Sequence, residues 1–296
     1  MEYQWRNAMT LNGIITCLLG CRAGTRPLAQ NGNGSNYHRC EKCGLAFVSR
    51  PPASPVLERL YLEDISSPTS YYAKTVEADR ITFVKRLRLL ARFQPERGLL
   101  LDIGCSTGTL MNIAASMGWK VEGVEPNPHA AYIARQQGFI VHEGFFSSVL
   151  DRRLKGKYQC VVMSDVIEHV PNPRDALIQA RQLLAPNGFL LLSTPNLESF
   201  WCKRFQLKPM EHLFLFNSKN LSLLLSGEAF EICHLEKTSR RRALGQLTHS
   251  TTEVGQESLT LIRYLSRLRL DGALAWMMEH FLKDELVVIA RKTRRL

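Results

Sequence analysis

The sequence lacks the long apolar runs of a membrane-spanning protein. No apolar stretch in its 296 residues reaches the roughly 20 residues that a helix needs to cross a bilayer. Ahead of the apolar segment 11–21, Glu2 and Arg6 cancel, so the basic leader of a secretory signal is missing. The composition is that of an ordinary globular protein, with 45% hydrophobic and 22% charged residues. These absences predict a cytoplasmic protein without a transmembrane segment.

The chain also lacks internal repeats and any basic run with interleaved aromatics of the kind that binds nucleic acids. Its net charge is nevertheless +11, and residues 237–296 hold 12 Lys or Arg against 6 Asp or Glu. Such a field favours anionic partners, whereas a solvated basic face explains the same composition. The sequence therefore disfavours a nucleic-acid partner without ruling it out.

Apolar segments alternate with helical ones through the second half of the chain. The run LLLDI (99–103) is typical of a strand buried on both faces of a parallel sheet. Strands are expected at 99–103, 120–125, 139–142, 158–164, 189–194, 231–237 and 285–292. Helices are expected at 76–93, 109–118, 128–137, 174–185 and 221–230. This alternation predicts a doubly wound α/β fold.

Composition shifts divide the chain into five parts. These are a cysteine-rich module (1–50), a helical linker or lid (51–95), the α/β core (96–239), a helical insertion (240–283), and a last strand with a basic tail (284–296). In the insertion, Arg263, Arg267 and Arg269 alternate with large apolar residues. This pattern fits a lid helix with its arginines in water, or a peripheral membrane-surface helix.

A glycine-containing turn, DIGCSTGTL, follows the first strand of the core. Two of the three glycines of a dinucleotide-binding fingerprint are replaced here. The spacing of Asp102, Gly104 and Gly108 instead suits an amino-acid tail, with free N–H groups at the start of the next helix. Further on, Glu125 ends the second strand, where a carboxylate can accept both hydrogen bonds of a ribose diol.

The stretch SDVIEHVPNP (164–173) places a cluster of chemically active residues just after the fourth strand. Asp165, Glu168 and His169 belong to it, and His212 comes later, after the fifth strand. In a doubly wound fold these positions share the carboxyl edge of the sheet. Carboxylates and imidazoles there can bind Mg²⁺, Mn²⁺ or Zn²⁺. They can equally provide a metal-free general base, or play a structural role.

Four of the eight cysteines cluster near the N-terminus as two pairs, Cys17 with Cys21 and Cys40 with Cys43. Thiolates at such spacings close a tetrahedral zinc site that can fold a segment too small to build its own core. Unligated thiols are the alternative. The remaining cysteines are scattered through apolar sequence, as buried reduced thiols of a cytosolic protein are.

Four segments carry a resemblance to a known family, namely LLLDIGCSTGTL, VEGVEPNP, SDVIEHVPNP and LLAPNGFLLLSTPN. In order and spacing they resemble the class I S-adenosylmethionine (SAM)-dependent methyltransferases, over about residues 95–235, and in particular the methyltransferase-23 group, which includes O-methyltransferases of quinone biosynthesis. The resemblance implies a Rossmann-like seven-stranded sheet with an antiparallel last strand and SAM as the cofactor. RCEKCGLAFVSRPP (39–52) resembles a zinc-ribbon-like module found before some of these domains.

The resemblance also implies roles for individual residues. Asp102, Gly104 and Gly108 would surround the methionine moiety, and Glu125 would hold the ribose. The cofactor-binding set implied is Asp102, Gly104, Cys105, Ser106, Gly108, Glu125, Pro126 and Asp165. The sequence departs from the family pattern where an acidic residue contacts adenine, because Phe145 and Phe146 stand there.

Two metal-assisted groups of the superfamily, the quinone O-methyltransferases and the small-RNA 3′-end ribose methyltransferases, carry an E-x-x-E-H element and a later histidine. Here the matching residues are Asp165, Glu168, His169 and His212, with Asp in place of the first Glu. The resemblance implies that these residues are catalytic. They would act either with Mg²⁺ or Mn²⁺ bound at Glu168 and His169, or without a metal ion.

The sequence thus predicts a SAM-dependent methyltransferase acting on oxygen of a small molecule: a sugar, a glycan precursor or a phenol. The alternatives are a ribose 2′-O-methyltransferase acting on RNA and a non-catalytic nucleotide-binding protein. Tyr71 and Tyr72 are expected near the cofactor entrance. Three aromatic residues could wall the acceptor, or simply pack in the core, namely Phe200, Trp201 and Phe205.

Overall fold

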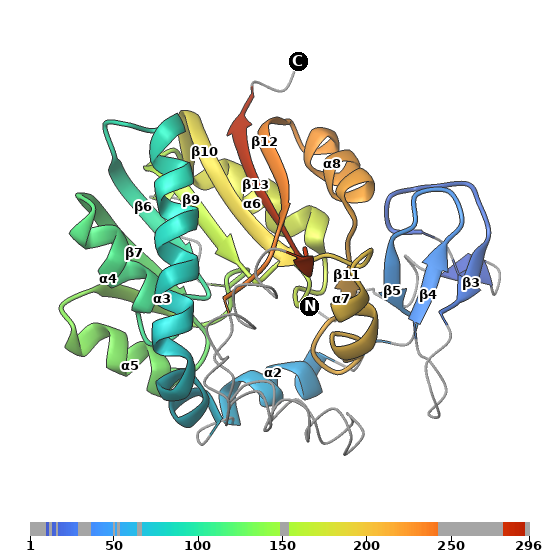
Figure 1. The fold of residues 1–296 in the computed structure, drawn as a ribbon, viewed down its shortest axis with the longest axis horizontal. Coiled ribbons are helices and arrows are strands. Elements are labelled where there is room, and N and C mark those ends of the chain that lie inside the picture. Colours follow the sequence, from blue (N-terminus) through green and yellow to red (C-terminus); the bar gives the residue numbers. More distant parts are fainter. Residues whose placement is uncertain are drawn as a thin grey trace.

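The computed structural model describes residues 10–11, 14–15, 17–28, 37–49, 51, 54–63, 67–148, 154–241 and 281–293. Its centre is a seven-stranded sheet in the order β12-β13-β10-β9-β6-β7-β8 (Figure 1). The strands are β6 Gly98–Ile103, β7 Trp119–Glu125, β8 Ile140–Glu143, β9 Tyr158–Ser164, β10 Leu184–Pro195, β12 Phe230–Thr238 and β13 Glu285–Lys292. Neighbours from β8 to β10 pair in parallel, whereas β13 is antiparallel to both β10 and β12. The predicted doubly wound sheet with an antiparallel last strand is confirmed.

Helices cover both faces of this sheet, as the fully apolar strands require. Leu100 and Leu191 pack with α3 (Ser67–Phe93) and α4 (Thr109–Ser116) on one face. Their strand neighbours Leu101 and Leu190 face the other side, where α6 (Pro173–Leu183) and α8 (Ser218–Gly227) supply apolar side chains. The helix α5 (Pro128–Gln136) packs its alanines beside α4. Successive residues of a strand thus serve opposite layers.

Helix boundaries differ from those predicted at several places, most of all at α3, which begins at Ser67 rather than at residue 76. The helix expected at 221–230 is α8, which begins earlier because Asn217 and Asn220 form a capping box at its start. It also ends earlier, because Ala229 adopts a left-handed φ of 59° and Phe230 already begins β12. The helix expected at 174–185 ends at Leu183, and the fifth strand starts at the next residue. Elsewhere each expected strand and helix is present.

The cysteine-rich segment forms a second, four-stranded sheet that the core completes. Its strands are β3 Thr25–Pro27, β4 Tyr37–Cys40, β5 Ala46–Val48 and β11 Phe214–Leu215, in the order β11-β5-β4-β3. The last of these comes from the core, beside α7 (Phe200–Phe205), and Figure 1 shows it between the two sheets. Nearer the N-terminus, Thr10–Leu11 (β1) pairs with Ile14–Ile15 (β2). The cysteine-rich segment and the core thus contribute strands to the same sheet.

The predicted insertion lies mostly outside the described residues, which stop at Arg241 and resume at Phe281. Its three alternating arginines therefore have no structural account, nor do the side chains of Tyr71, Tyr72 and Phe205. Both ends are anchored at the carboxyl edge of the sheet: Lys283 N donates to Ser239 Oγ at 2.7 Å, and Arg241 N to Thr82 Oγ1 at 3.1 Å. Within the described part of the chain, no helix is long and apolar enough to cross a membrane.

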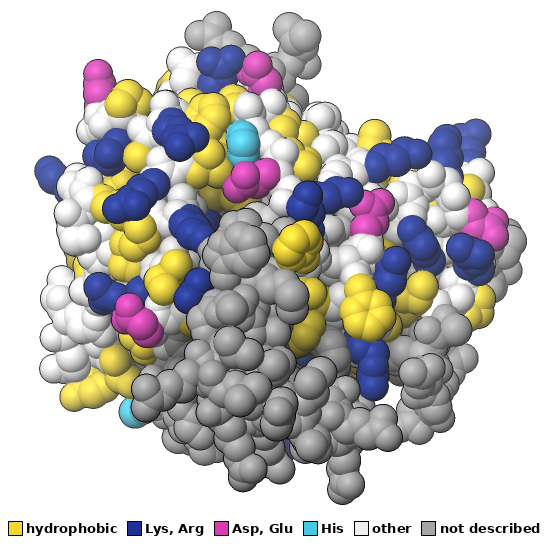
Figure 2. Space-filling model, viewed as in Figure 1, with side chains coloured by type: hydrophobic (Ala, Val, Ile, Leu, Met, Phe, Trp, Pro, Cys, Tyr) yellow, Lys and Arg dark blue, Asp and Glu magenta, His cyan; other side chains and the backbone are white. Residues whose placement is uncertain are grey.

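Basic side chains are spread over the visible face rather than gathered in one stripe. Figure 2 shows lysines and arginines interspersed with apolar and acidic side chains across this face. A positive stripe that follows a nucleic-acid backbone is therefore not evident on this side.

Phe214 joins the two sheets and tests how much they depend on each other. It is fully buried and packs with Phe47 of the small sheet and Leu221 of α8. We expect Phe214→Ala to lower the free energy of unfolding by about 3–5 kcal/mol in urea denaturation, because a buried aromatic leaves a cavity. The control Leu223→Ala, at a half-exposed position of α8, should change it by less than about 0.5 kcal/mol. Equal effects of the two substitutions would contradict the shared core.

Candidate active site and metal-binding residues

The turn between β6 and α4 has the backbone geometry of a ligand cradle. Gly104, Ser106 and Gly108 have positive φ angles of 75°, 48° and 89°. Gly104 N and Cys105 N both donate to Val124 O of β7, at 2.8 and 3.1 Å, so the turn is tied to the neighbouring strand. A Cβ added at Gly104 would lie 3.0 Å from Val166 Cγ2. Only glycine therefore fits at this point.

Glu125 ends β7 and is held rigidly beside that turn. Its carboxylate accepts Ser106 N at 2.8 Å on Oε2 and Asn127 N at 2.9 Å on Oε1. Asn127 in turn caps α5 by accepting Ala130 N. Burial raises the pKa of Glu125, while the two backbone donors oppose the rise. Each oxygen keeps a lone pair for a further donor, as a ribose diol requires, and Pro126 beside it is half-buried.

Asp102 lies near the end of β6 and is buried, at 2% exposure. Burial, and then the charge of Glu125, raises its pKa to about 8. The hydroxyl of Ser106 is also buried and has no hydrogen-bond partner among the described residues. A buried carboxyl and an unsatisfied hydroxyl beside a strained turn fit a ligand that brings a cationic amine and polar atoms. The residues thus fit SAM, whose methionine part carries an ammonium group.

Cys105 belongs to the same turn, but its side chain faces the core. It packs with Met111 and Ala134, and its Sγ would lie 2.6 Å from a Cβ at Gly123. Burial raises the pKa of its thiol, so it is a neutral core residue. Only its backbone is at the surface of the cradle.

Glu168, His169 and His212 come together beyond the end of β9. Each contributes a ligand atom, and these atoms lie within 4.8 Å of one another. The two imidazole rings are 4.9 Å apart between centroids, and His169 Nε2 lies 3.8 Å from Glu168 Oε1. The structure therefore assembles three of the four residues of the predicted cluster.

Backbone carbonyls orient both imidazoles. His169 Nδ1 donates to Glu211 O, and His212 Nδ1 donates to Gln206 O, each at 2.8 Å. In the neutral rings the Nε2 atoms then carry the free lone pairs. Burial lowers the pKa of His169, and burial together with His169 lowers that of His212 to about 3. Both rings are therefore neutral at physiological pH and able to accept a proton or a metal ion.

Glu168 is the most enclosed member of the group, at 1% exposure. Its Oε2 accepts the hydroxyl of Thr194 at 3.0 Å, while Oε1 has no hydrogen-bond partner in the described part of the chain. Burial, and then the charge of Asp165, raises its pKa well above the ordinary value. An unsatisfied buried carboxyl oxygen facing two imidazoles suits either a shared proton or a cation.

Asp165 is not part of this group, because two arginines hold its carboxylate. Its Oδ2 accepts Arg240 Nη1 at 2.8 Å and lies 3.8 Å from Arg86 Nη1. Burial would raise the pKa of Asp165, but Arg240 and then Arg86 keep it below its ordinary value. The arginines also bind Asp79 and Glu285, at 2.7 and 2.6 Å. The predicted fourth ligand is thus an ionised member of a separate network.

Sequence reasoning missed several residues of the site. Tyr61, on α2 (Ser54–Glu63), packs edge-on against both Phe145 and His169, with ring centroids 6.2 and 6.3 Å apart. Its carbonyl accepts Asn127 Nδ2 at 3.0 Å, so α2 contacts both the segment that follows Glu125 and the imidazole of His169. The arginines of the Asp165 network were also missed, since no local motif marks them. Of the aromatic residues proposed for the acceptor wall, Phe200 is 75% exposed.

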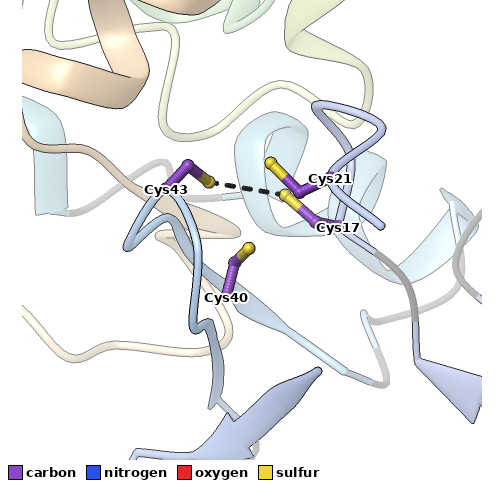
Figure 3. Close-up of side chains that lie close together, drawn as sticks. All are labelled: Cys17, Cys21, Cys40 and Cys43. Atoms are coloured by element: carbon purple, nitrogen blue, oxygen red, sulfur yellow. Dashed lines mark hydrogen bonds between the residues drawn. The ribbon is translucent and has the colours of Figure 1, made fainter. Parts of the chain in front are cut away.

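The four N-terminal cysteines converge as predicted. Their sulfur atoms lie within 4.8 Å of one another, and Figure 3 shows Cys17, Cys21, Cys40 and Cys43 facing a common centre. The Cys17–Cys43 separation of 3.6 Å is close to the ~3.8 Å between sulfurs in a tetrahedral site with 2.3 Å Zn–S bonds. The hydrogen bond with Cys17, together with the backbone of Leu45, lowers the pKa of Cys43 to about 5 against the opposing effect of burial. The residues therefore fit zinc.

The comparisons with known proteins agree with this geometry. The methyltransferase-23 family model, described as a methyltransferase domain, matches residues 75–235, more than half of the chain. The chain therefore belongs to this methyltransferase family. It also resembles ubiquinone biosynthesis O-methyltransferases of Caulobacter sp. (33% identity; 40% of this chain, 51% of that one) and Burkholderia multivorans (31% identity; 32% and 44%). The chain thus spans about half the length of these curated relatives.

Solved structures share the fold at low sequence identity. A didemethyltoxoflavin N1-methyltransferase of Burkholderia thailandensis, solved with its acceptor and S-adenosylhomocysteine (SAH), aligns with a TM-score of 0.55 and 16% identity, over 91% of this chain and 100% of that one. A SAM-dependent methyltransferase of Thermotoga maritima aligns with a TM-score of 0.52 and 19% identity, over 81% and 99%. At these identities the likeness concerns the fold alone.

The depressed pKa of His212 predicts a specific loss of stability in acid. Unfolded histidine binds a proton below pH ~6.5, whereas folded His212 stays neutral down to about pH 3. The unfolded state therefore gains protons first, and stability falls as the pH drops through this window. Between pH 7 and pH 5, we expect the free energy of unfolding to fall by about 2 kcal/mol less in His212→Asn than in wild type. Urea denaturation at the two pH values measures this difference.

The control for this prediction is His129→Asn, at an exposed position on α5, which should leave the acid slope unchanged. Identical slopes for His212→Asn and wild type would show that His212 titrates normally in the folded protein.

Proposed function

We propose that this chain is a SAM-dependent methyltransferase that transfers the methyl group to an oxygen of a small molecule, a sugar, a glycan precursor or a phenol. One observation carries the proposal. The cofactor cradle after β6 and the Glu168–His169–His212 group after β9 lie on adjacent strands, separated at Gly104 by the side chain of Val166. Adjacent parallel strands with crossovers in opposite directions form the binding crevice of a doubly wound fold.

The cofactor would lie across the β6 and β7 ends. Asp102 would face its ammonium group, the turn from Gly104 to Gly108 its carboxylate end, and Glu125 its ribose diol. SAM supplies an electrophilic methyl group on a sulfonium sulfur. The chain's own task is to orient the acceptor and remove its proton.

His169 is the proposed general base. Its Nε2 takes the acceptor's hydroxyl proton as the new carbon–oxygen bond forms and the carbon–sulfur bond breaks. The hydrogen bond from Nδ1 to Glu211 O stabilises the imidazolium that results. Two neighbours flank this base: the His212 ring lies 4.9 Å from the His169 ring between centroids, and Glu168 Oε1 lies 3.8 Å from His169 Nε2.

A divalent cation is the second candidate for the same atoms. Glu168 Oε1 and the two Nε2 atoms form a mixed oxygen–nitrogen donor set that suits Mn²⁺, and Mg²⁺ with added waters. A cation there would lower the pKa of the acceptor hydroxyl instead. We assign zinc to the cysteine cluster in either case, as a structural ion. None of the eight cysteines forms a disulfide, which supports the proposed cytoplasmic location.

Cofactor binding provides the first test. We expect Asp102→Asn to weaken SAH binding roughly 10- to 100-fold in calorimetric titration, because a charge-assisted hydrogen bond to the ammonium is lost. The control Glu143→Gln, at an exposed carboxylate paired with Arg135, should bind like wild type. Absence of any SAH affinity in wild type would refute the proposed function.

Turnover provides the second test, with labelled SAM and a panel of phenols, sugars and an RNA oligonucleotide. We expect His169→Asn to lower kcat roughly 10²- to 10⁴-fold, the range of general base catalysis, with SAH affinity within about 2-fold of wild type. His129→Asn is the matched control. EDTA treatment that leaves the cysteine-bound zinc in place, verified by mass spectrometry, separates the mechanisms, since only the cation version then loses turnover. SAH binding without transfer to any acceptor would favour the non-catalytic alternative, and transfer only to RNA would favour the ribose methyltransferase.

A further inference from the structure

Residues 211–215, here called the bridging strip, lie between the cysteine-rich sheet and the proposed reaction centre. On the side of the small sheet, Tyr37 Oη donates to His212 O at 2.5 Å, and Val48 N donates to Leu213 O at 3.0 Å. The strip then continues as β11, which pairs with β5. Strands β4 and β5 of the cysteine-rich module thus hold the backbone at His212 in place.

The other side of the bridging strip holds the reaction centre. Glu211 O accepts the Nδ1–H of His169 at 2.8 Å. Leu213 N and Phe214 N both donate to the carbonyl of Glu168, at 2.8 and 3.1 Å. All three members of the Glu168–His169–His212 group therefore depend on this strip for their placement.

Two members of the cysteine cluster lie in the hairpin that holds the strip. Cys40 ends β4 and Cys43 lies in the turn before β5, where Cys40 N donates to Leu45 O at 2.9 Å. Cys43 O accepts the side-chain amide of Asn220 at 3.3 Å, in the capping box that follows the strip. Cys17 and Cys21 come from a separate loop. An ion bound by all four sulfurs would cross-link that loop to the β4–β5 hairpin.

We propose that zinc binding at the cysteine cluster positions His169 and His212 through Tyr37 and the bridging strip, so that metal loading of the module sets the geometry of the reaction centre. Tyr37 is then a positioning residue: it is completely buried and acts through the backbone of His212. The inference rests on the proposed function only where it names the two imidazoles as the reaction centre. The physical coupling is independent of turnover.

The first experiment follows the histidine rings in ¹³C-histidine-labelled protein by NMR. It uses a Cys233→Ser background, which removes a partly exposed thiol on β12. Zinc is measured by mass spectrometry before and after chelation, and in Cys43→Ser. We expect zinc loss to move the His169 and His212 signals, leave that of His129 in place, and keep SAH affinity within about 2-fold. Added ZnCl₂ should restore the signals of the chelated protein.

Two outcomes would overturn the proposal: stoichiometric zinc loss with unchanged His169 and His212 signals, or purified protein with intact cysteines and no bound zinc. Loss of SAH binding together with zinc would also overturn it, because zinc would then hold the entire fold rather than this strip. Failure of the wild type to bind SAH refutes the proposed function instead, and the ring signals still report the coupling.

Tyr37→Phe tests the coupling with the metal in place. We expect it to retain zinc, to shift the His212 signal, and to lower kcat about 5-fold while KM for SAM stays the same, since one buried hydrogen bond is lost. Tyr132→Phe, at an exposed position, is the matched control. A Tyr37→Phe protein with wild-type signals and kcat would show that the small sheet does not position His212.

Discussion

The carbonyl of Glu168 accepts two backbone N–H groups from the bridging strip, and the arrangement of the site depends on this interaction. The turn after β9 leaves the sheet at its carboxyl edge, so its backbone has no neighbouring strand to pair with. A buried carbonyl without donors costs about 1–3 kcal/mol. Leu213 and Phe214 supply those donors. His169 directly follows Glu168 and His212 directly precedes Leu213, so this contact brings the two imidazoles together. The cysteine-rich sheet is attached through the same strip.

Charge at the carboxyl edge is divided between two groups of residues. The arginines Arg86 and Arg240 form ion pairs with Asp165 and its acidic neighbours toward α3 and β13, and they keep the pKa of Asp165 below its ordinary value. The Glu168 side of the edge is instead shifted toward its neutral forms, since burial disfavours charge there. A pair of neutral imidazoles does not repel a sulfonium and leaves Nε2 lone pairs for an acceptor proton.

Local patterns in the sequence carried most of the fold. Apolar runs and capping residues located every strand of the seven-stranded sheet and the helices that cover it, because burial on both faces of a parallel sheet leaves a clear signature; the short elements α7 and β11 were not predicted. Errors arose at helix ends, where caps such as Asn217 shifted the boundary. The Asp102–Glu125 cradle followed from spacing, since residues of one turn and the next strand end are close in any doubly wound sheet. The convergence of the four cysteines was predicted in the same way.

Contacts between distant segments were beyond the reach of the sequence. Nothing local indicated that Asp165 binds arginines from α3 and from beyond β12, or that β11 of the core completes the cysteine-rich sheet. The sequence by itself determined the order of elements and the chemical groups brought to the carboxyl edge, because periodicity and turn chemistry are short-range properties. Only the tertiary structure decided which of those groups lie together and which are paired with a counter-charge, because their pKa values and partners depend on burial by segments far apart in the chain.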